Sequence, residues 1–327
     1  MKIAVVGAGA VGSLVGGLLA DGGEDVTLIG RGEHVRAIQE RGLHLEGAVG
    51  ERVVRIKAQE QLTESPELTI FATKTQDLAE ACRSVAPLVG EGPVITMQNG
   101  VRCDRIAREF FIPDQIVGCM VFCSATFLEP GRVSCQVRGW LTIGDPFIYQ
   151  PSRLQKIKSV LSKALPVHIS RDISATRWTK LITNLNNALP AVTGLPLQEI
   201  YFSKSTSQIP LRIMREGLDT LSAARVRIDN SPQALAVRLA TRLPESIPTA
   251  VLGALSHTRM GRQPMFGSTW QSIKRGSATE IDYLNGEIVD LGKKIGHATP
   301  YNAHVVQLVH EVEKSGKFYP LEKLWPK

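Results

Sequence analysis

The sequence lacks the features that mark several common classes of protein. It has no long run of Lys or Arg and no aromatic residues interleaved with basic ones, so its net charge of +7 does not indicate nucleic-acid binding. No stretch of about 18 consecutive apolar residues occurs, which predicts that no segment spans a membrane. Internal repeats and low-complexity segments are also absent. The composition, with 43% hydrophobic and 21% charged residues among 327, is typical of a soluble globular protein long enough for two domains.

Cysteine is scarce, and its spacing excludes two further classes. An odd number of cysteines without paired spacing argues against a disulfide framework, so we expect reduced and mostly buried thiols in a cytoplasmic protein. The seven histidines do not cluster with acids, so no metal site is predicted. The five cysteines are Cys82, Cys103, Cys119, Cys123 and Cys135.

Strands and helices alternate in the first half of the chain. A strand at 2–6, a glycine turn at 7–12, a helix at 11–20 and a strand at 25–29 form one βαβ unit. The glycines within 1–20 favour this interpretation over a signal peptide. Two short β runs within 132–144 could form a hairpin. The alternation predicts a mainly parallel, doubly wound Rossmann-like sheet. Further strands are expected at 68–73, 93–98, 115–123 and 166–170, and further helices at 77–88, 102–111 and 152–164.

The second half of the chain has a different character. Apolar residues recur at helical spacing and strand signals nearly vanish, which predicts an all-helical domain. The segment 244–266 contains prolines and is expected to connect helices irregularly. We therefore predict two domains, 1–171 and 172–327. The expected helices of the second domain are 173–192, 207–224, 232–243, 280–296 and 303–315.

The glycine turn fits the pattern G-x-G-x-x-G, which is specific here because it follows a strand and opens a helix. The first glycine permits the tight turn, and the second lets the backbone approach a pyrophosphate. The third allows close packing of helix and strand, with the helix N-terminus directed at the phosphates. The sequence therefore predicts a dinucleotide site rather than an empty glycine-rich turn. Its residues are Gly7, Ala8, Gly9, Ala10, Val11 and Gly12.

The end of the second strand favours NADPH/NADP+ as the coenzyme. An NAD site usually places an acid there to hold the ribose hydroxyls. This chain instead has Gly30 and Arg31, and a guanidinium can pair with the 2′-phosphate of NADP. The alternative is a solvated loop arginine.

Two further strands are followed by polar residues. Lys74 follows the strand at 68–73, and Asn99 follows the strand at 93–98. Because the carboxyl ends of strands line the ligand crevice of an open α/β sheet, both side chains are candidates for coenzyme or substrate contacts. From the residues alone, an exposed lysine and an Asn-Gly turn are equally good interpretations.

The helical half contains three stretches with candidate polar residues. Lys180, Asn184 and Asn187 lie at i, i+4 and i+7, so they would share a helix face that could bind and polarise a keto acid, although a solvated face has the same spacing. The second stretch is 267–271, beginning Gly-Ser-Thr-Trp. The third is 279–286, Thr-Glu-Ile-Asp-Tyr-Leu-Asn-Gly, where Ser277 and Glu280 also fit a helix capping box.

The chain resembles the ketopantoate reductases (2-dehydropantoate 2-reductases) over nearly its whole length. The resemblance rests on GAGAVG at 7–12, the lysine after the 68–73 strand, QNG at 98–100 and W-x-K-L-x-x-N at 178–184. The most specific stretch is S-x-x-x-S-x-x-R-G-x-x-T-E-I-D-Y-L-N-G at 268–286.

This resemblance implies a two-domain enzyme with its active site in the interdomain cleft. It would reduce 2-dehydropantoate to pantoate with NADPH, in pantothenate and coenzyme A synthesis. Lys180 would be the general acid, Glu280 would position lysine, substrate or coenzyme, Asn184 would contact the substrate, and Ser268 would bind near its carboxylate. Lys74 and Asn99 would line the coenzyme pocket. The oligomeric state is left open, a homodimer included.

One departure from the family pattern concerns the substrate. The family motif usually has a second substrate-facing asparagine at position 188, where this chain has Ala188 preceded by Asn187. Asn187 is the candidate replacement. A related reductase of another 2-oxo acid is therefore the first alternative, and a non-catalytic NADP(H)-binding regulator is the second. Retention of the helical-half motifs argues against the regulator, which needs only the N-terminal site.

Overall fold

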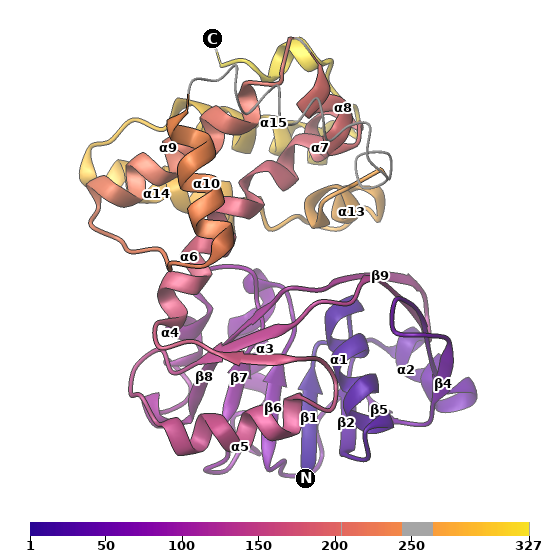
Figure 1. Cartoon of the computed structure of the whole chain (residues 1–327). Helices are drawn as coiled ribbons and strands as arrows, with labels where there is room; N and C mark the ends of the chain where they lie inside the picture. The colour runs from indigo at the N-terminus through magenta and orange to yellow at the C-terminus, as the bar shows by residue number, and fades with distance from the viewer. Residues whose placement is uncertain (204, 244–263, 327) are drawn as a thin grey trace. The chain divides into compact units, whose positions relative to one another are not determined.

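The computed structural model describes residues 1–203, 205–243 and 264–326 (Figure 1). The chain divides into two compact units, Met1–Thr176 and Arg177–Lys327. Strands occur only in the first unit of the described chain, and the described part of the second is helical. The predicted fold class, a Rossmann-like sheet followed by an all-helical part, is confirmed. The division falls inside α6 (Ile173–Asn184).

An eight-stranded sheet forms the centre of the first unit. Its order is β12-β11-β8-β7-β6-β1-β2-β5, and every neighbouring pair is parallel except β8 and β11. The chain begins at the central strand β1 and adds β2 and β5 on one side of it. It then crosses over and adds β6, β7 and the remaining strands on the other side. In open α/β sheets, ligands bind at the carboxyl ends of the strands that flank such a reversal, which here are β1 and β6. The strands are β1 (Lys2–Val6), β2 (Asp25–Ile29), β5 (Lys57–Gln59), β6 (Leu68–Phe71), β7 (Val94–Thr96), β8 (Ile116–Val121), β11 (Leu141–Gly144) and β12 (Val167–Ile169).

Both faces of this sheet are covered, as a doubly wound fold requires. On one face, α1 (Ala10–Asp21) and α5 (Pro151–Leu161) contribute apolar side chains to the larger core. On the other face, α3 (Leu78–Val85) and α4 (Cys103–Ala107) form a smaller core with β6 and β7. Four of the five cysteines are buried and Cys123 is half-buried, which confirms that most of the thiols are buried. Turns η1 (Thr75–Asp77) and η2 (Pro113–Gln115) complete the crossovers.

A second sheet, of order β4-β3-β10-β9, packs on the outer face of α1. Its strands are β3 (Leu43–Gly47), β4 (Arg52–Val54), β9 (Ser124–Glu129) and β10 (Arg132–Val137), and α2 (Gly32–Arg41) precedes it. The hairpin suggested for 132–144 is wrong. β10 instead pairs with β9 and β3, while β11 joins the large sheet. Gly17 lets this sheet approach α1, because a Cβ there would lie 2.7 Å from Leu43 Cδ2.

A buried histidine joins these layers. His34 on α2 is 4% exposed. Its Nδ1 accepts from the Gly131 N–H at 2.9 Å, so Nε2 must carry the ring proton and donate to Ser13 Oγ, also at 2.9 Å. The ring therefore links α2, α1 and the turn between β9 and β10.

The long helix predicted over 173–192 is three segments. After α6 the chain forms a 3₁₀ turn, η3 (Leu185–Asn187), and then α7 (Ala188–Thr193). Pro190 has no N–H to bond one turn back, and asparagine side chains compete with helical hydrogen bonds. Asn186 illustrates this competition, because its Nδ2 donates to Tyr201 Oη and to the Pro210 carbonyl, both at 3.2 Å.

The other helices of the second unit follow in order. The predicted helices near 207–224, 232–243 and 303–315 are confirmed, and that over 280–296 begins as a 3₁₀ turn. The helical turn starts at Ile281 with Glu280 as its N-cap, so the capping box proposed with Ser277 as the N-cap is wrong. Most of the segment 244–266 lies outside the described residues. The elements are α8 (Leu197–Phe202), α9 (Ile209–Ala223), α10 (Pro232–Arg242), α13 (Ser268–Lys274), η4 (Ile281–Tyr283), α14 (Asn285–Ile295), α15 (Pro300–Ser315) and η5 (Leu321–Leu324).

A buried carboxylate organises three of these helices. Glu216 of α9 accepts hydrogen bonds from the backbone N–H groups of Tyr301 and Asn302, at 2.9 and 2.8 Å, at the start of α15. It also accepts from Asn302 Nδ2 at 2.7 Å. Asn302 Oδ1 in turn accepts from Asn285 Nδ2 of α14 at 3.0 Å. The negative charge therefore lies at a helix N-terminus, where the helix dipole stabilises it.

No described helix has both the length and the apolarity needed to cross a membrane.

Candidate active site

The fold itself requires two of the three glycines in the turn after β1. Gly7 has φ of 102°, and a Cβ there would lie 2.5 Å from the Thr73 backbone nitrogen. A Cβ on Gly12 would lie 2.1 Å from the Gly7 carbonyl oxygen. The N–H groups of Gly7 and Ala8 both donate to the Ile29 carbonyl at 2.9 Å. These contacts fix the turn against the ends of β2 and β6.

Gly9 is different, because nothing in the fold explains why it is a glycine. Its φ of −81° is open to any residue, and a Cβ there would meet no atom within 4 Å. Gly9 is also the N-cap of α1 and provides no side-chain cap for the first turn. The helix N-terminus, including Ala10 and Val11, therefore presents backbone N–H groups beside open space. Such a site suits an anion such as a pyrophosphate that approaches the backbone closely.

The residues predicted after β6 and β7 lie at this same edge of the sheet. β1, β6 and β7 are parallel neighbours, so Lys74 and Asn99 follow strand ends on the side where the glycine turn lies. Both side chains are half-buried. Gln98 ties the two strand ends together, since its Nε2 donates to the carbonyls of Phe71 and Thr73 at 3.0 and 3.2 Å.

Arg31 lies at the same edge, one strand further along. It is the N-cap of α2 and is exposed, and it makes no hydrogen bond or ion pair with any described residue. A carboxylate lies nearby, because a Cβ on the adjacent Gly32 would be 3.0 Å from Glu60 Oε1. Sequence reasoning missed Glu60. The signal that could have revealed it is the end of a short strand, β5, parallel to β2.

The second unit contains the other candidate residues. Lys180 and Asn184 lie one turn apart on α6, and both are half-buried. Asn187 is the last residue of the 3₁₀ turn η3, so the predicted i+7 relation along one continuous helix does not exist. Asn187 packs against the residue before Ser268, since a Cβ on Gly267 would lie 2.6 Å from Asn187 Cβ. The structure thus brings Asn187 close to the start of α13, where Ser268 is exposed.

The third motif is anchored to α6 by an asparagine that sequence reasoning did not select. Asn285 is fully buried, and its Nδ2 donates at 3.1 Å to the carbonyl of Leu185, just after α6. The segment that holds Glu280 is fixed at its other side, because the Thr279 N–H donates to Glu313 Oε1 at 2.8 Å. Glu280 itself is half-buried. The only sequence signal for these anchors was the length of the motif at 279–286.

The fold and these positions define a class of protein: a parallel α/β unit with a glycine turn at its topological switch point, followed by a helical unit. Two family models match the chain, "Ketopantoate reductase PanE/ApbA" over residues 3–146 and "Ketopantoate reductase PanE/ApbA C terminal" over residues 172–313. The 2-dehydropantoate 2-reductase of Pyrococcus horikoshii is 31% identical over 322 residues, which are 97% of this chain and 99% of that protein.

Solved structures agree with these matches. A PanE/ApbA family ketopantoate reductase from Ralstonia eutropha JMP134 has a TM-score of 0.82 at 30% identity, covering 96% of this chain and 99% of that one. A D-mandelate dehydrogenase, solved with NADH and anilino(oxo)acetate, has a TM-score of 0.84 at 26% identity with the same coverage. The chain belongs to the ketopantoate reductase family of oxidoreductases.

Proposed function

We propose that the protein catalyses the NADPH-dependent reduction of a 2-oxo acid, with 2-dehydropantoate as the first candidate and (R)-pantoate as its product. It would then act in the cytoplasm, in pantothenate and coenzyme A biosynthesis. The observation that carries this proposal is the uncapped N-terminus of α1 beside Gly9, where the fold itself gives no reason for a glycine. Family membership adds the reaction class.

The residues of the first unit fit a dinucleotide. The turn from Gly7 to Gly12 would bind the pyrophosphate, Arg31 would pair with the 2′-phosphate, and Lys74 and Asn99 would line the pocket. The bound nicotinamide supplies the hydride for the ketone carbon. The protein then has to bind the substrate, orient it and stabilise the charge that develops on its oxygen.

Lys180 would provide that stabilisation. An ammonium beside the keto oxygen lowers the energy of the developing alkoxide and then donates a proton to the oxygen. Asn184 and Asn187 would orient the substrate through their amides, and Ser268 would bind near its carboxylate. Glu280 would position the lysine, and its charge would favour the protonated amine.

The role of Gly9 can be tested by Gly9→Ala. We expect the free energy of unfolding to change by less than about 1 kcal/mol, since the backbone conformation suits alanine and no atom is displaced. The dissociation constant for NADPH, measured by fluorescence titration, should rise at least about tenfold because the methyl group enters the pyrophosphate site. Gly12→Ala is the contrasting variant, since its Cβ collides with the Gly7 carbonyl and should destabilise the fold. Wild-type NADPH binding by Gly9→Ala would refute the pyrophosphate assignment.

Coenzyme preference should depend on Arg31. Removing a charge-assisted contact with a phosphate costs about 1.5–3 kcal/mol, so Arg31→Ala should weaken NADPH binding about 10- to 100-fold while NADH binding changes little. Arg36→Ala, which removes an exposed arginine from the same helix, is the matched control. Equal losses for both coenzymes would argue against the 2′-phosphate contact. Glu60 lies at the same edge, and a carboxylate there can bind the ribose hydroxyls of NADH. The affinity for NADH therefore has to be measured beside that for NADPH.

The second candidate substrate is a 2-oxo acid other than 2-dehydropantoate. Ala188 is the observation that favours it. The Ala188 side chain is 1% exposed, so it offers no polar group where the family pattern has an amide. Steady-state oxidation of NADPH with a panel of 2-oxo acids separates the candidates by kcat/KM. We expect 2-dehydropantoate to rank first. A higher kcat/KM for an aryl or shorter 2-oxo acid would select the second candidate, and no oxidation with any of them would favour a regulator.

A further inference from the structure

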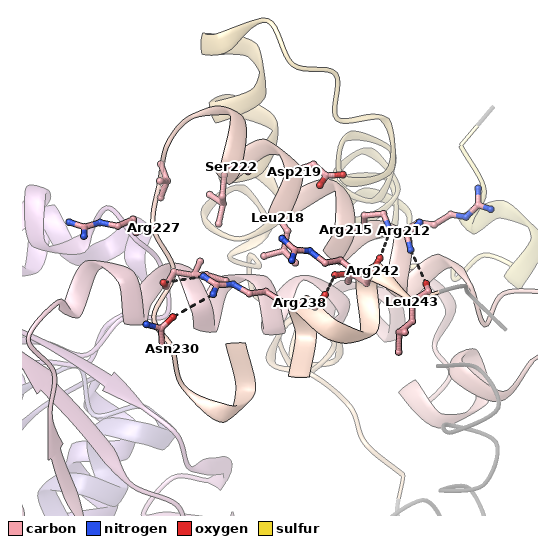
Figure 2. A pocket seen from close by; sticks show the side chains of 14 residues that line it. Arg212, Arg215, Leu218, Asp219, Ser222, Arg227, Asn230, Arg238, Arg242 and Leu243 are labelled. Carbon is pink, nitrogen blue, oxygen red and sulfur yellow. Dashed lines mark hydrogen bonds between the residues drawn. The ribbon is translucent and has the colours of Figure 1, made fainter. Parts of the chain in front are cut away.

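A cavity lies within the second unit, between α9, α10 and the loop 226–230. Its volume is about 1130 Å³. Among the residues that the structure describes, its charged lining consists of five arginines and one aspartate, namely Arg212, Arg215, Arg227, Arg238, Arg242 and Asp219 (Figure 2). None of the family motifs in the sequence includes these residues. The cavity therefore has a strongly positive lining to which the proposed reaction assigns no role.

Two of the arginines lie one turn apart on α10. Arg238 donates to the Ile228 carbonyl at 3.4 Å and to Asn230 Oδ1 at 3.5 Å, so its partners are neutral. Arg242 is exposed and makes no hydrogen bond or ion pair with a described residue. Like charges at this spacing repel each other across the helix surface. No carboxylate among the described residues forms an ion pair with either guanidinium.

A third arginine approaches from the opposite helix. Arg215 of α9 donates through Nε to the Thr241 carbonyl at 2.6 Å and through Nη2 to the Leu243 carbonyl at 3.4 Å. These bonds hold its guanidinium at the C-terminal end of α10, beside Arg242 in the close view (Figure 2). Guanidinium groups from two facing helices are thus fixed around one space. Arg227 and Arg212 point away from the centre of the cavity in the same view.

We propose that this cavity binds a small polyanion that carries a chain of phosphate groups. Guanidinium groups bind phosphate oxygens in pairs of charge-assisted hydrogen bonds, and several of them around one space match several phosphates better than a single carboxylate. The volume exceeds what one small anion fills and is slightly above the usual range for small-molecule sites. The site is separate from the glycine turn, and the inference does not rest on the proposed reductase activity.

The probe for this site is inorganic tripolyphosphate, titrated calorimetrically into the full-length protein at constant ionic strength. We expect one equivalent to bind, with an affinity that saturating NADPH leaves unchanged. Arg242→Gln should weaken binding about tenfold or more, as loss of one charge-assisted contact predicts. A parallel titration with adenosine triphosphate distinguishes the source. Tighter binding than tripolyphosphate assigns a nucleotide, and equal affinity assigns the phosphate chain alone.

The control is Arg105→Gln, which removes an exposed arginine from the last turn of a helix in the first unit, as Arg242→Gln does in the second. The melting temperature of each variant checks that folding is intact, and the exposed position of Arg242 makes a folding defect easy to recognise. Absence of tripolyphosphate binding would overturn the proposal. So would binding that NADPH abolishes, or an equal loss of affinity in Arg105→Gln, since these outcomes would assign the anion to the glycine turn or to general charge.

Discussion

Replacing Lys180 with alanine should lower kcat by about 100- to 10,000-fold, the usual contribution of a positioned general acid. The reason is that no other group assigned to the substrate carries a proton suited to the alkoxide. The amides of Asn184 and Asn187 can donate hydrogen bonds, but they do not give up a proton at neutral pH. Coenzyme binding should stay within about twofold of the wild type, because the dinucleotide residues are all in the first unit.

The measurement separates these two quantities. Single-turnover oxidation of NADPH with saturating 2-oxo acid reports the chemical step, and fluorescence titration reports coenzyme affinity. Lys156→Ala, which removes an exposed lysine from α5, is the matched control and should keep full turnover. If Lys180→Ala turned over at the wild-type rate, another proton donor would have to be sought.

Acid should destabilise the protein through His34. Burial lowers the pKa of this imidazole from 6.5 to about 4. Below pH 6.5 the unfolded chain therefore binds a proton at this position that the folded state does not. The contribution of the neutral ring to the free energy of unfolding is complete above pH 6.5 and is lost as the pH falls from there toward 4. Integrated over this window, the loss is about 3 kcal/mol. The unprotonated Nδ1 also accepts the Gly131 N–H, and protonation would end that hydrogen bond.

Urea unfolding at pH 7 and pH 4.5 measures this effect, with His34→Gln as the comparison. A glutamine amide can accept from Gly131 and donate to Ser13, but it does not titrate in this range. The wild type should lose about 2–3 kcal/mol more than His34→Gln between the two pH values. The comparison also cancels other groups, such as His310, whose pKa is raised by hydrogen bonds to Glu313 and Asp282 in opposition to its desolvation. Equal losses in both proteins would show that His34 is not the titrating group.

The large sheet could be predicted because its strands are short apolar runs between helices. The second sheet could not. Its strands β3 and β4 are short and carry polar residues, so they show neither a continuous apolar run nor a clear alternation. The β runs within 132–144 were recognised, but periodicity identifies strands without naming their partners. β10 pairs with a strand about ninety residues earlier, and that choice depends on packing against α1.

The candidate site was predictable where local spacing has a direct physical meaning. The glycine turn is such a case. A Cβ on Gly7 or Gly12 would collide with neighbouring atoms, and Gly9 lies beside open space. The face shared by Lys180, Asn184 and Asn187 was not, because the helix changes to a 3₁₀ turn at Leu185. Asn285 and Glu216 were missed for a related reason. Their partners are distant in sequence, so no local pattern distinguishes them from solvated residues.

The carboxylate of Glu216 has a consequence for how far the chain can be shortened. It accepts hydrogen bonds from the first turn of α15, so a protein ending before Pro300 would keep a buried anion without its donors. The last thirty or so residues are therefore needed for the helical unit to fold. Deleting them should leave the helical half unable to fold, while a cut close to the final residues, beyond α15, would spare this arrangement.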